Sequence, residues 1–521
     1  MNGTDNNART QVSLLPPEQV RMETPRGTYA GRSIRVPDEK MEDQPSLRKL
    51  PSLAFSRIFR YLQLRDIRSL EQVCNFLHKV VKEDNALAKA WYRRFSSSHQ
   101  YQLKMSMTAK NKNQLYDWFE SFTSDQALVK SLADRNPEEV YVPALFFFTK
   151  SKLMSECKTF KLVTASKIKK NEQVTSASLS VDGRHMITTC INDSAKIFVN
   201  KPDGSWQPEA IFPHAKAVTS ASFSPSGDHV VTASKDGTAI IYGLKADRSW
   251  EPVGRISHTK KVQSATFSTD GRRVVTASSD MSAKIYGLKD DGSWESEATI
   301  LTNSPIIFAT FSPDGYHLIT ACLVDTAKIH TQQTDGSWRE KATIPHFDMV
   351  ISAAFSPDGR HVVTASMDKT AKINGQKADG SWEPEDTIHH ISRVLTANFS
   401  PDSRYVVTAS LEGTVKIHSQ RADGSWQPEA NIVHEQGVFS GIFSPDGRNV
   451  VTAGNDGTAK IIGKKDDGTW LEKACISHKD GCWINSASFS TDGQYVVSVA
   501  SNRSVKITEL RKNHSLFSVT E

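Results

Sequence analysis

A period of 44 residues constrains most strongly what this chain can fold into. Seven tryptophans recur at that spacing in the C-terminal two-thirds of the sequence: Trp206, Trp250, Trp294, Trp338, Trp382, Trp426 and Trp470. A second series runs in the same phase: Leu179, Phe223, Phe267, Phe311, Phe355, Phe399, Phe443 and, after a two-residue insertion, Phe489. A fixed period in the forties indicates that one supersecondary unit is repeated around an axis or along a solenoid.

Each period is typical of four antiparallel strands. In the fifth repeat we predict strands over residues 350–356, 361–366, 371–374 and 381–388, joined by turns. Asp358-Gly359 and Asp379-Gly380 mark two of these turns, since the Asp-Gly dipeptide tolerates the positive φ of a tight hairpin. A meander of this size is a propeller blade, and blades must stack because one blade cannot bury both of its faces.

The number of strands predicts how the ring closes. The first-strand pattern occurs eight times, beginning near Val174, Val218, Val262, Ile306, Val350, Val394, Val438 and Ile484, but the Trp-containing fourth strand occurs only seven times. We expect residues 158–165 to supply the missing outer strand and to cover the open edges of the ring. The predicted fold is mostly β: an eight-bladed propeller closed by an N-terminal outer strand and preceded by a small α-helical module and a helical linker.

The repeats resemble WD-repeats, although their third strands end in pairs such as Tyr242-Gly243 or Asn374-Gly375 instead of Trp-Asp. The resemblance implies a hydrogen bond between a His before the first strand and an acid in the second-to-third turn. Five blades carry both partners: His214 with Asp236, His258 with Asp280, His346 with Asp368, His390 with Glu412, and His434 with Asp456. Blades one and four lack both residues at these positions. We interpret the pairs as structural, because half of a buried pair is costly and a metal site would need clustered ligands.

The N-terminal region changes character at residue 47. Residues 1–46 show no hydrophobic period, and we expect a disordered arm there. Residues 47–95 have apolar residues at helical spacing, for example Phe55, Ile58, Phe59 and Leu62. Three short helices of this size form a core that a partner would complete.

This segment resembles the F-box motif. The resemblance rests on Leu50-Pro51, the run from Ile58 to Leu62, Asp66-Ile67, Leu70, Val73-Cys74 and Trp91. F-boxes bind the Skp-type adaptor of cullin–RING ubiquitin ligases. The resemblance implies an adaptor-binding or supporting role for Leu50, Pro51, Ile58, Leu62, Leu70 and Val73. The alternative is a small helical bundle that only packs on the propeller.

The remaining boundaries follow from these assignments. Residues 96–156 are predicted to form a helical linker, with amphipathic stretches at 114–122 and 126–132 and breaks at Pro137 and Pro143. Residues 157–511 form the propeller, and residues 512–521 form a C-terminal tail. We expect the linker to set the distance between the helical module and the repeats.

Positions at which the repeats differ predict where a partner binds. These are the loops before the first strands, the second residue of each first strand, and the residue before each turn acid. The basic members are Lys235, Lys260, Lys261 and Arg393; the apolar members are Ile307, Leu323, Met349, Ile351, Met367, Leu395, Leu411 and Phe439. An apolar patch rimmed by charge is typical of a partner surface, and the basic blades favour an acidic or phosphorylated segment. The alternative is drift among the repeats, with some of these side chains buried.

Composition argues against several other classes. The formal net charge of +6 over 521 residues favours neither nucleic acid nor an anionic membrane as a partner. No stretch reaches the ~20 apolar residues of a membrane span. The six cysteines form no CxxC pair, so we expect reduced thiols without disulfides or zinc. No GxxxxGK, HExxH or GxSxG motif is present, so we expect no cofactor and no enzymatic activity.

Together these features predict a non-catalytic, cytoplasmic substrate receptor. The F-box-like module would bind a Skp-type adaptor, and the propeller would bind an unknown target protein. The near-identical repeats resemble bacterial propellers, which suggests a bacterial protein acting in the cytosol of a eukaryotic host. Two alternatives remain: an interaction scaffold unrelated to ubiquitination, and a quinone-dependent dehydrogenase, a class that also uses eight blades with outer-strand Trp motifs.

Overall fold

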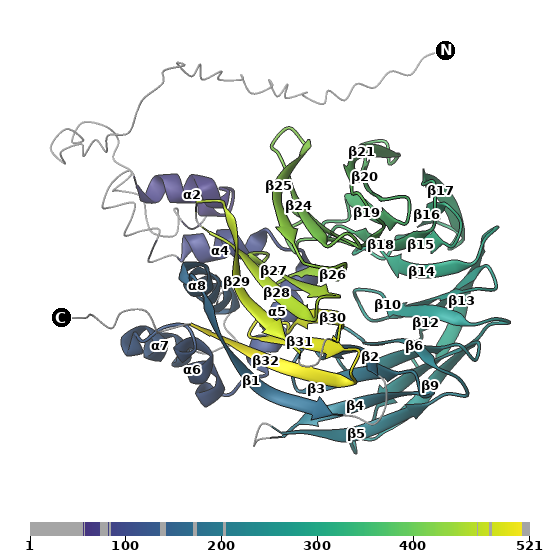
Figure 1. Cartoon of the computed structure of the whole chain (residues 1–521), viewed down its shortest axis with the longest axis horizontal. Helices are drawn as coiled ribbons and strands as arrows, with labels where there is room; N and C mark the ends of the chain where they lie inside the picture. The colour runs from purple at the N-terminus through teal and green to yellow at the C-terminus, as the bar shows by residue number, and fades with distance from the viewer. Residues whose placement is uncertain are drawn as a thin grey trace, which may run out of the picture. The chain divides into compact units, whose positions relative to one another are not determined.

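A computed structural model describes residues 56, 58–72, 82, 85–135, 142–169, 174–201, 205–465, 467–478 and 482–512. These residues form eight four-stranded antiparallel sheets and a group of helices (Figure 1). The eight-bladed propeller predicted from the 44-residue period is confirmed. Neighbouring blades contact one another around the whole ring, including the eighth and the first.

The strands fall into four series. The inner strands are β2 (Val174–Leu179), β6 (Val218–Phe223), β10 (Val262–Phe267), β14 (Ile306–Phe311), β18 (Val350–Phe355), β22 (Val394–Phe399), β26 (Val438–Phe443) and β30 (Ile484–Phe489). The second strands are β3 (His185–Cys190), β7 (His229–Ser234), β11 (Arg273–Ser278), β15 (His317–Cys322), β19 (His361–Ser366), β23 (Tyr405–Ser410), β27 (Asn449–Gly454) and β31 (Tyr495–Ala500). The third strands are β4 (Ser194–Asn200), β8 (Thr238–Leu244), β12 (Ser282–Leu288), β16 (Thr326–Gln332), β20 (Thr370–Gln376), β24 (Thr414–Gln420), β28 (Thr458–Lys464) and β32 (Ser504–Lys512). The outer strands are β5 (Trp206–Pro213), β9 (Trp250–Ser257), β13 (Trp294–Leu301), β17 (Trp338–Pro345), β21 (Trp382–His389), β25 (Trp426–Val433), β29 (Trp470–Ser477) and, for the eighth blade, β1 (Phe160–Lys169).

The closure strand is longer than expected. β1 pairs antiparallel with β32 from Phe160↔Lys512 to Lys169↔Ser504, so the predicted end at residue 165 falls four residues short. The register shifts between Thr164 and Ser166, and this irregularity keeps β1 aligned with the full length of β32. The last propeller strand likewise extends one residue beyond the predicted boundary at 511.

The tryptophan series holds neighbouring blades together. Each Trp is the first residue of an outer strand. Trp294 lies beside Phe267 of its own blade, with ring centroids 6.0 Å apart, and joins a core with Val231 and Ile241 of the preceding blade. Trp382 is arranged in the same way: it lies beside Phe355 of its own blade five and joins a core with residues of blade four. The two periodic series of the sequence therefore meet in the cores between the blades.

All eight inner strands contain a β-bulge at their second residue. In β18, Val350 pairs with Ser366 and Ser352 pairs with Ala365, so Ile351 is the extra residue. The same shift occurs in the other inner strands. Bulges redirect a side chain and increase the local twist. The second-residue positions, which the sequence singled out by their variability, are thus the bulged positions.

Six helices with described bounds precede the propeller: α2 (Leu64–Glu71), α4 (Ala86–Arg93), α5 (Ser97–Thr108), α6 (Lys112–Glu120), α7 (Gln126–Ala133) and α8 (Val142–Glu156). One core joins Trp91 and Phe95 to Trp118 and Phe147, with Trp91 and Trp118 fully buried. This core continues across the boundary predicted between residues 95 and 96. Pro143 does not break a helix but lies in the first turn of α8, where a missing amide hydrogen costs little.

The helices pack against one end of the propeller. This end carries the turns between first and second strands, and we call it the helix end. Arg94 contacts Asp402 and the Asp446 carbonyl, His99 contacts the Pro445 carbonyl, and Lys110 and Lys150 contact Asp492. The opposite end, the loop end, carries the loops before the inner strands and the second-to-third turns. Figure 1 shows the helices beside β1 and β32, which belong to the closing blade.

Candidate protein-binding surfaces

Backbone hydrogen bonds bring the variable positions of the loop end side by side. In blade five the Met367 amide donates to the Met349 carbonyl at 2.9 Å. Every described blade from two to eight repeats this bond between the residue before the turn acid and the residue before the inner strand. The pairs are Lys235 with Ala217, Ser279 with Lys261, Leu323 with Pro305, Leu411 with Arg393, Asn455 with Gly437, and Ser501 with Trp483. The residues predicted to face a partner therefore share one end of the propeller.

The structure leaves all of these predicted residues accessible. Lys235, Lys260, Lys261, Leu323 and Arg393 are exposed. The half-buried members are Ile307, Met349, Ile351, Met367, Leu395, Leu411 and Phe439. None of these side chains is fully buried, but the partner role stays a prediction and drift among the repeats stays its alternative.

Further exposed apolar residues lie at the loop end, and of these only Phe347 belongs to the variable loop residues that the sequence singled out. Phe347 is 94% exposed and Ile391 is 82% exposed, and both follow the loop histidine of their blades. Leu301, Val324 and Val433 are also exposed at this end. The sequence already distinguishes Phe347 and Ile391, because the residue after the loop histidine is small or polar in other blades, namely Ala215 or Thr259.

The structure places each predicted loop histidine against its acid. The Nδ1 atoms of His214, His258, His346, His390 and His434 lie 3.1, 2.9, 2.8, 2.9 and 2.9 Å from the carboxylates of Asp236, Asp280, Asp368, Glu412 and Asp456. In blade five the Thr364 hydroxyl lies 2.8 Å from Nε2 of His346. Nδ1–H therefore donates to Asp368, and Nε2 accepts from Thr364.

Burial and hydrogen bonding set the charges of these pairs. Burial lowers the pKa of His346 below its usual 6.5, and the Asp368 carboxylate opposes that shift only in part. Burial also raises the pKa of Asp368, but hydrogen bonds from Thr370, the Phe347 amide and His346 outweigh it and lower the pKa to about 2. A neutral imidazole bound to a carboxylate results, which anchors each loop without serving as an acid or base.

The predicted adaptor-binding residues are described only in part. Leu50, Pro51 and Val73 lie outside the described residues, as does the side chain of Leu70. Ile58 is 42% exposed, whereas Leu62 packs against the small core of Phe59 and Ile67. Tyr61, which lies in the motif but was given no adaptor-binding role, is 89% exposed. Ile58 and Tyr61 thus place two large side chains on the surface ahead of α2.

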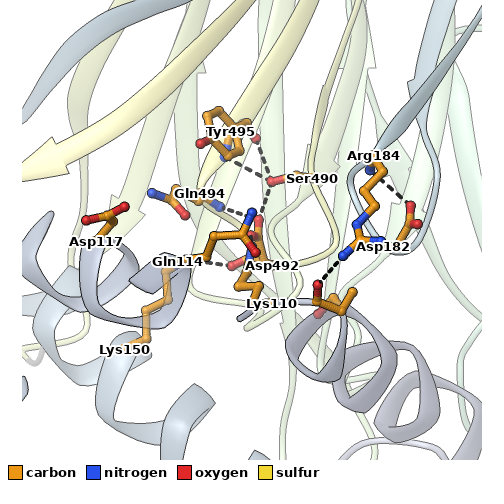
Figure 2. Close-up of polar contacts among 12 residues, drawn as sticks. Lys110, Gln114, Asp117, Lys150, Asp182, Arg184, Ser490, Asp492, Gln494 and Tyr495 are labelled. Atoms are coloured by element: carbon orange, nitrogen blue, oxygen red, sulfur yellow. Dashed lines mark hydrogen bonds and ion pairs between the residues drawn. The ribbon is translucent and has the colours of Figure 1, made fainter. Parts of the chain in front are cut away.

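The junction between the helices and the propeller contains a buried charged cluster (Figure 2). Lys110 forms an ion pair with Asp492 at 2.7 Å, and Lys150 Nζ donates to the Asp492 carbonyl at 2.7 Å. Burial lowers the pKa of Lys150 to about 7, and its Nζ lies 4.3 Å from the centroid of the Trp118 ring. A polar cleft of about 540 Å³ opens beside this cluster, lined in part by Gln114 and Arg184.

The described residues contain no group of three or more His, Cys, Asp or Glu side chains arranged to hold a metal ion. Within the same residues, no helix combines the length and the apolar character needed to cross a membrane.

Six segments of the chain match the family described as "WD domain, G-beta repeat": residues 206–243, 250–287, 338–373, 382–419, 426–462 and 471–508. Each segment joins an outer strand to the next blade. The matches leave out the first three strands of blades one and four, which are the blades without a loop histidine. No curated protein matches the sequence.

Solved WD-repeat propellers have the same fold. The C-terminal WD40 domain of Sif2 superimposes with a TM-score of 0.57 at 16% identity, covering 67% of this chain and 98% of that one. Sqt1 from Chaetomium thermophilum gives a TM-score of 0.56 at 15% identity, with coverages of 67% and 98%. The same protein bound to the N-terminus of a ribosomal protein gives 0.56 at 16% identity, with coverages of 68% and 100%.

Proposed function

We propose that this WD-repeat protein is a non-catalytic bridging adaptor whose two binding surfaces lie at opposite ends of one propeller. The helical module would bind a Skp-type adaptor of a cullin–RING ubiquitin ligase. The loop end would bind the protein to be ubiquitinated. The chain would act in a eukaryotic cytosol, where it could belong to the host or to a bacterium that delivers it.

The observation that carries this proposal is the position of the helices. They contact the first-to-second turns of blades six to eight, through Arg94, His99, Lys110 and Lys150. The variable positions lie at the opposite end, as the paired backbone hydrogen bonds show. A partner bound at the loop end is therefore spatially separate from a partner bound by the helices.

A firm connection between the two surfaces suits a bridging role. Lys150 is fully buried at the junction, and Lys473 of β29 donates to the Met154 carbonyl of α8 at 2.9 Å. Phe122, Met154 and Phe160 share a core with Val451 and Ile484 of the propeller. A fixed geometry raises the effective concentration of one partner beside the other, and this is the contribution of a substrate receptor.

The test is capture of a purified Skp-type adaptor by the full chain. We expect wild-type protein to capture it, and we expect Leu50→Ala/Pro51→Ala and Ile58→Asp each to reduce capture by about tenfold or more, since a buried interface tolerates neither truncation nor a new charge. Ile211→Asp is the matched control, because Ile211 is an exposed isoleucine on outer strand β5. The ligase proposal fails if the wild type captures no adaptor, or if all variants capture it equally.

A second candidate is an interaction scaffold without a ligase. The shared core of the helices and the closing blade favours it, because those helices could serve only to cover the closure. In that case the adaptor would not bind, while ligand binding at the loop end would remain.

A further inference from the structure

The loop end is divided into two arcs of different chemistry. The apolar arc comprises the bulged residues of blades four to seven, Ile307, Ile351, Leu395 and Phe439, with the exposed Phe347 and Ile391. The lysine arc comprises Lys216, Lys235, Lys260 and Lys261 of blades two and three, all exposed. Blades three and four are neighbours in the ring, so the two arcs adjoin.

We propose that the loop end binds a peptide segment of two parts: apolar side chains that cover the apolar arc, and carboxylates that lie over the lysine arc, with no phosphate required. The proposal rests on the target-binding role of the loop end given above and defines the chemistry of the target. It does not depend on the identity of whatever the helices bind.

The bulged residues separate the blades into two kinds. In blades one to three they are polar and already bonded within the propeller. Thr175 lies 2.6 Å from the Thr189 hydroxyl, Thr219 donates to the Val262 carbonyl at 2.7 Å, and Gln263 donates to the Ser279 hydroxyl at 3.1 Å. In blades four to seven the same position is apolar and half-buried. Those four side chains gain burial only from a partner.

The apolar arc is continuous because its strands are neighbours. β14, β18, β22 and β26 contact one another in sequence around the ring. Next to these strands, the Met367 amide donates to the Met349 carbonyl, and the Phe347 amide donates to Asp368, which fixes the backbone that carries the exposed ring. Pre-positioned apolar and aromatic side chains surrounded by polar loops are the usual anchors of an interface.

The lysine arc favours carboxylates. None of its four ammonium groups forms an ion pair within the described part of the chain. The turn acids of the same blades, Asp236 and Asp280, are directed toward their histidines. Recognition of a phosphate favours the planar fork of arginine, whereas separate lysines act as point charges that attract an acidic stretch. The lysine arc contains no arginine.

The experiment is a selection of displayed random peptides on the full chain, followed by anisotropy measurements on the peptides obtained. We expect enrichment of Asp and Glu together with Leu, Phe or Trp. Phe347→Asp and Leu395→Asp should each weaken binding by about tenfold. Phe347 is almost fully exposed, so its substitution tests the arc without disturbing the fold. Lys260→Glu/Lys261→Glu should weaken binding by about tenfold and reduce its salt dependence.

Matched controls come from the other end of the same blades. Lys245 and Lys289 lie in the third-to-fourth turns of blades two and three, and Lys245→Glu/Lys289→Glu should change affinity less than about twofold. The proposal is overturned if no peptide is obtained, if the peptides lack acidic residues, if Phe347→Asp binds normally, or if binding requires phosphoserine in place of Glu. Adaptor capture by the same variants should be unchanged, which separates this result from a failure of the ligase proposal.

Discussion

At the scale of single residues, most blades either contain both the loop histidine and its acid or lack both. Five blades place the histidine on an acid, and blades one and four have neither partner. Blade eight uses a third arrangement: Ser504 donates to Asn502 and lies 2.9 Å from Nδ1 of His478, and Ser498 lies 2.8 Å from Nε2. In the five blades with an acid, burial lowers the pKa of the imidazole and both ring nitrogens have a hydrogen-bond partner, which agrees with the cost of an unsatisfied buried polar group.

His389, the last residue of β21, and His390, the loop histidine of blade six, allow this interpretation to be tested. His390 is buried against Glu412, and its neighbour His389 is exposed. We expect His390→Ala to reduce the free energy of unfolding by about 1–3 kcal/mol, because Glu412 loses a donor in a largely buried site. His389→Ala should change it by less than about 0.5 kcal/mol. Urea denaturation monitored by tryptophan fluorescence measures both values.

The pH dependence of this effect has a definite sign. Burial lowers the pKa of His390 below 6.5 in the folded chain, so the unfolded chain takes up the proton first as the pH falls. The stability that His390 contributes is therefore complete above about pH 6.5 and is lost progressively below it. The difference between wild type and His390→Ala should shrink between pH 8 and pH 5.5, and a difference that grows in acid would contradict the neutral imidazole.

At the scale of elements, the sequence predicts the features that recur in every repeat. It does not predict the features that depend on how two strands or two helices pair. The blade count and the closure strand follow from counting Trp and Phe positions. The eight bulges do not, because a bulge is a relation between two strands and Ile351 looks like any other strand residue. The extension of β1 to Lys169 was missed for the same reason, because it depends on pairing with β32. The core shared by Trp91 and Phe147 could not be predicted either, since apolar spacing defines a helical face but not its partner.

The closure of the ring can be tested with a cross-link. Lys161 of β1 lies opposite Arg511 of β32, and both side chains are exposed. We expect Lys161→Cys/Arg511→Cys to form a disulfide on mild oxidation and to raise the free energy of unfolding by about 2–4 kcal/mol, since it closes a long loop in the unfolded chain. Non-reducing electrophoresis and urea denaturation with and without reductant measure these effects.

The control for register uses the same strand pair. Lys506 lies opposite Lys167, six residues along β1 from Lys161. Lys161→Cys/Lys506→Cys should not cross-link, because six residues of extended strand exceed the reach of a disulfide. Equal cross-linking of the two pairs would show that β1 does not hold the register described.

At the scale of the whole molecule, the helices recognise a turn that every blade repeats. The Ser-x-Asp-Gly turn of blade eight holds Asp492 with the Ser490 hydroxyl and the Gln494 amide, and blade four holds Asp314 with Ser312 and Tyr316 in the same way. Only the first of these two turns receives Lys110 and Lys150. The two lysines are thus directed at one member of a repeated set, while Arg94 pairs with Asp402 in the corresponding turn of blade six. Residues 55–521 behave as one compact unit.

This difference between equivalent turns predicts which substitution destabilises the junction between the helices and the propeller. Asp492→Ala removes the carboxylate that pairs with Lys110 and adjoins Lys150, and leaves two lysines in a buried site. We expect a loss of about 3–5 kcal/mol in the free energy of unfolding and faster amide hydrogen exchange in α5 and α8. Asp314→Ala removes the same turn contacts without a lysine, so it should cost about 1 kcal/mol and leave exchange in the helices unchanged. Equal exchange in the helices of both variants would mean that apolar contacts alone hold the module, and its distance from the loop end would then not depend on the charged cluster.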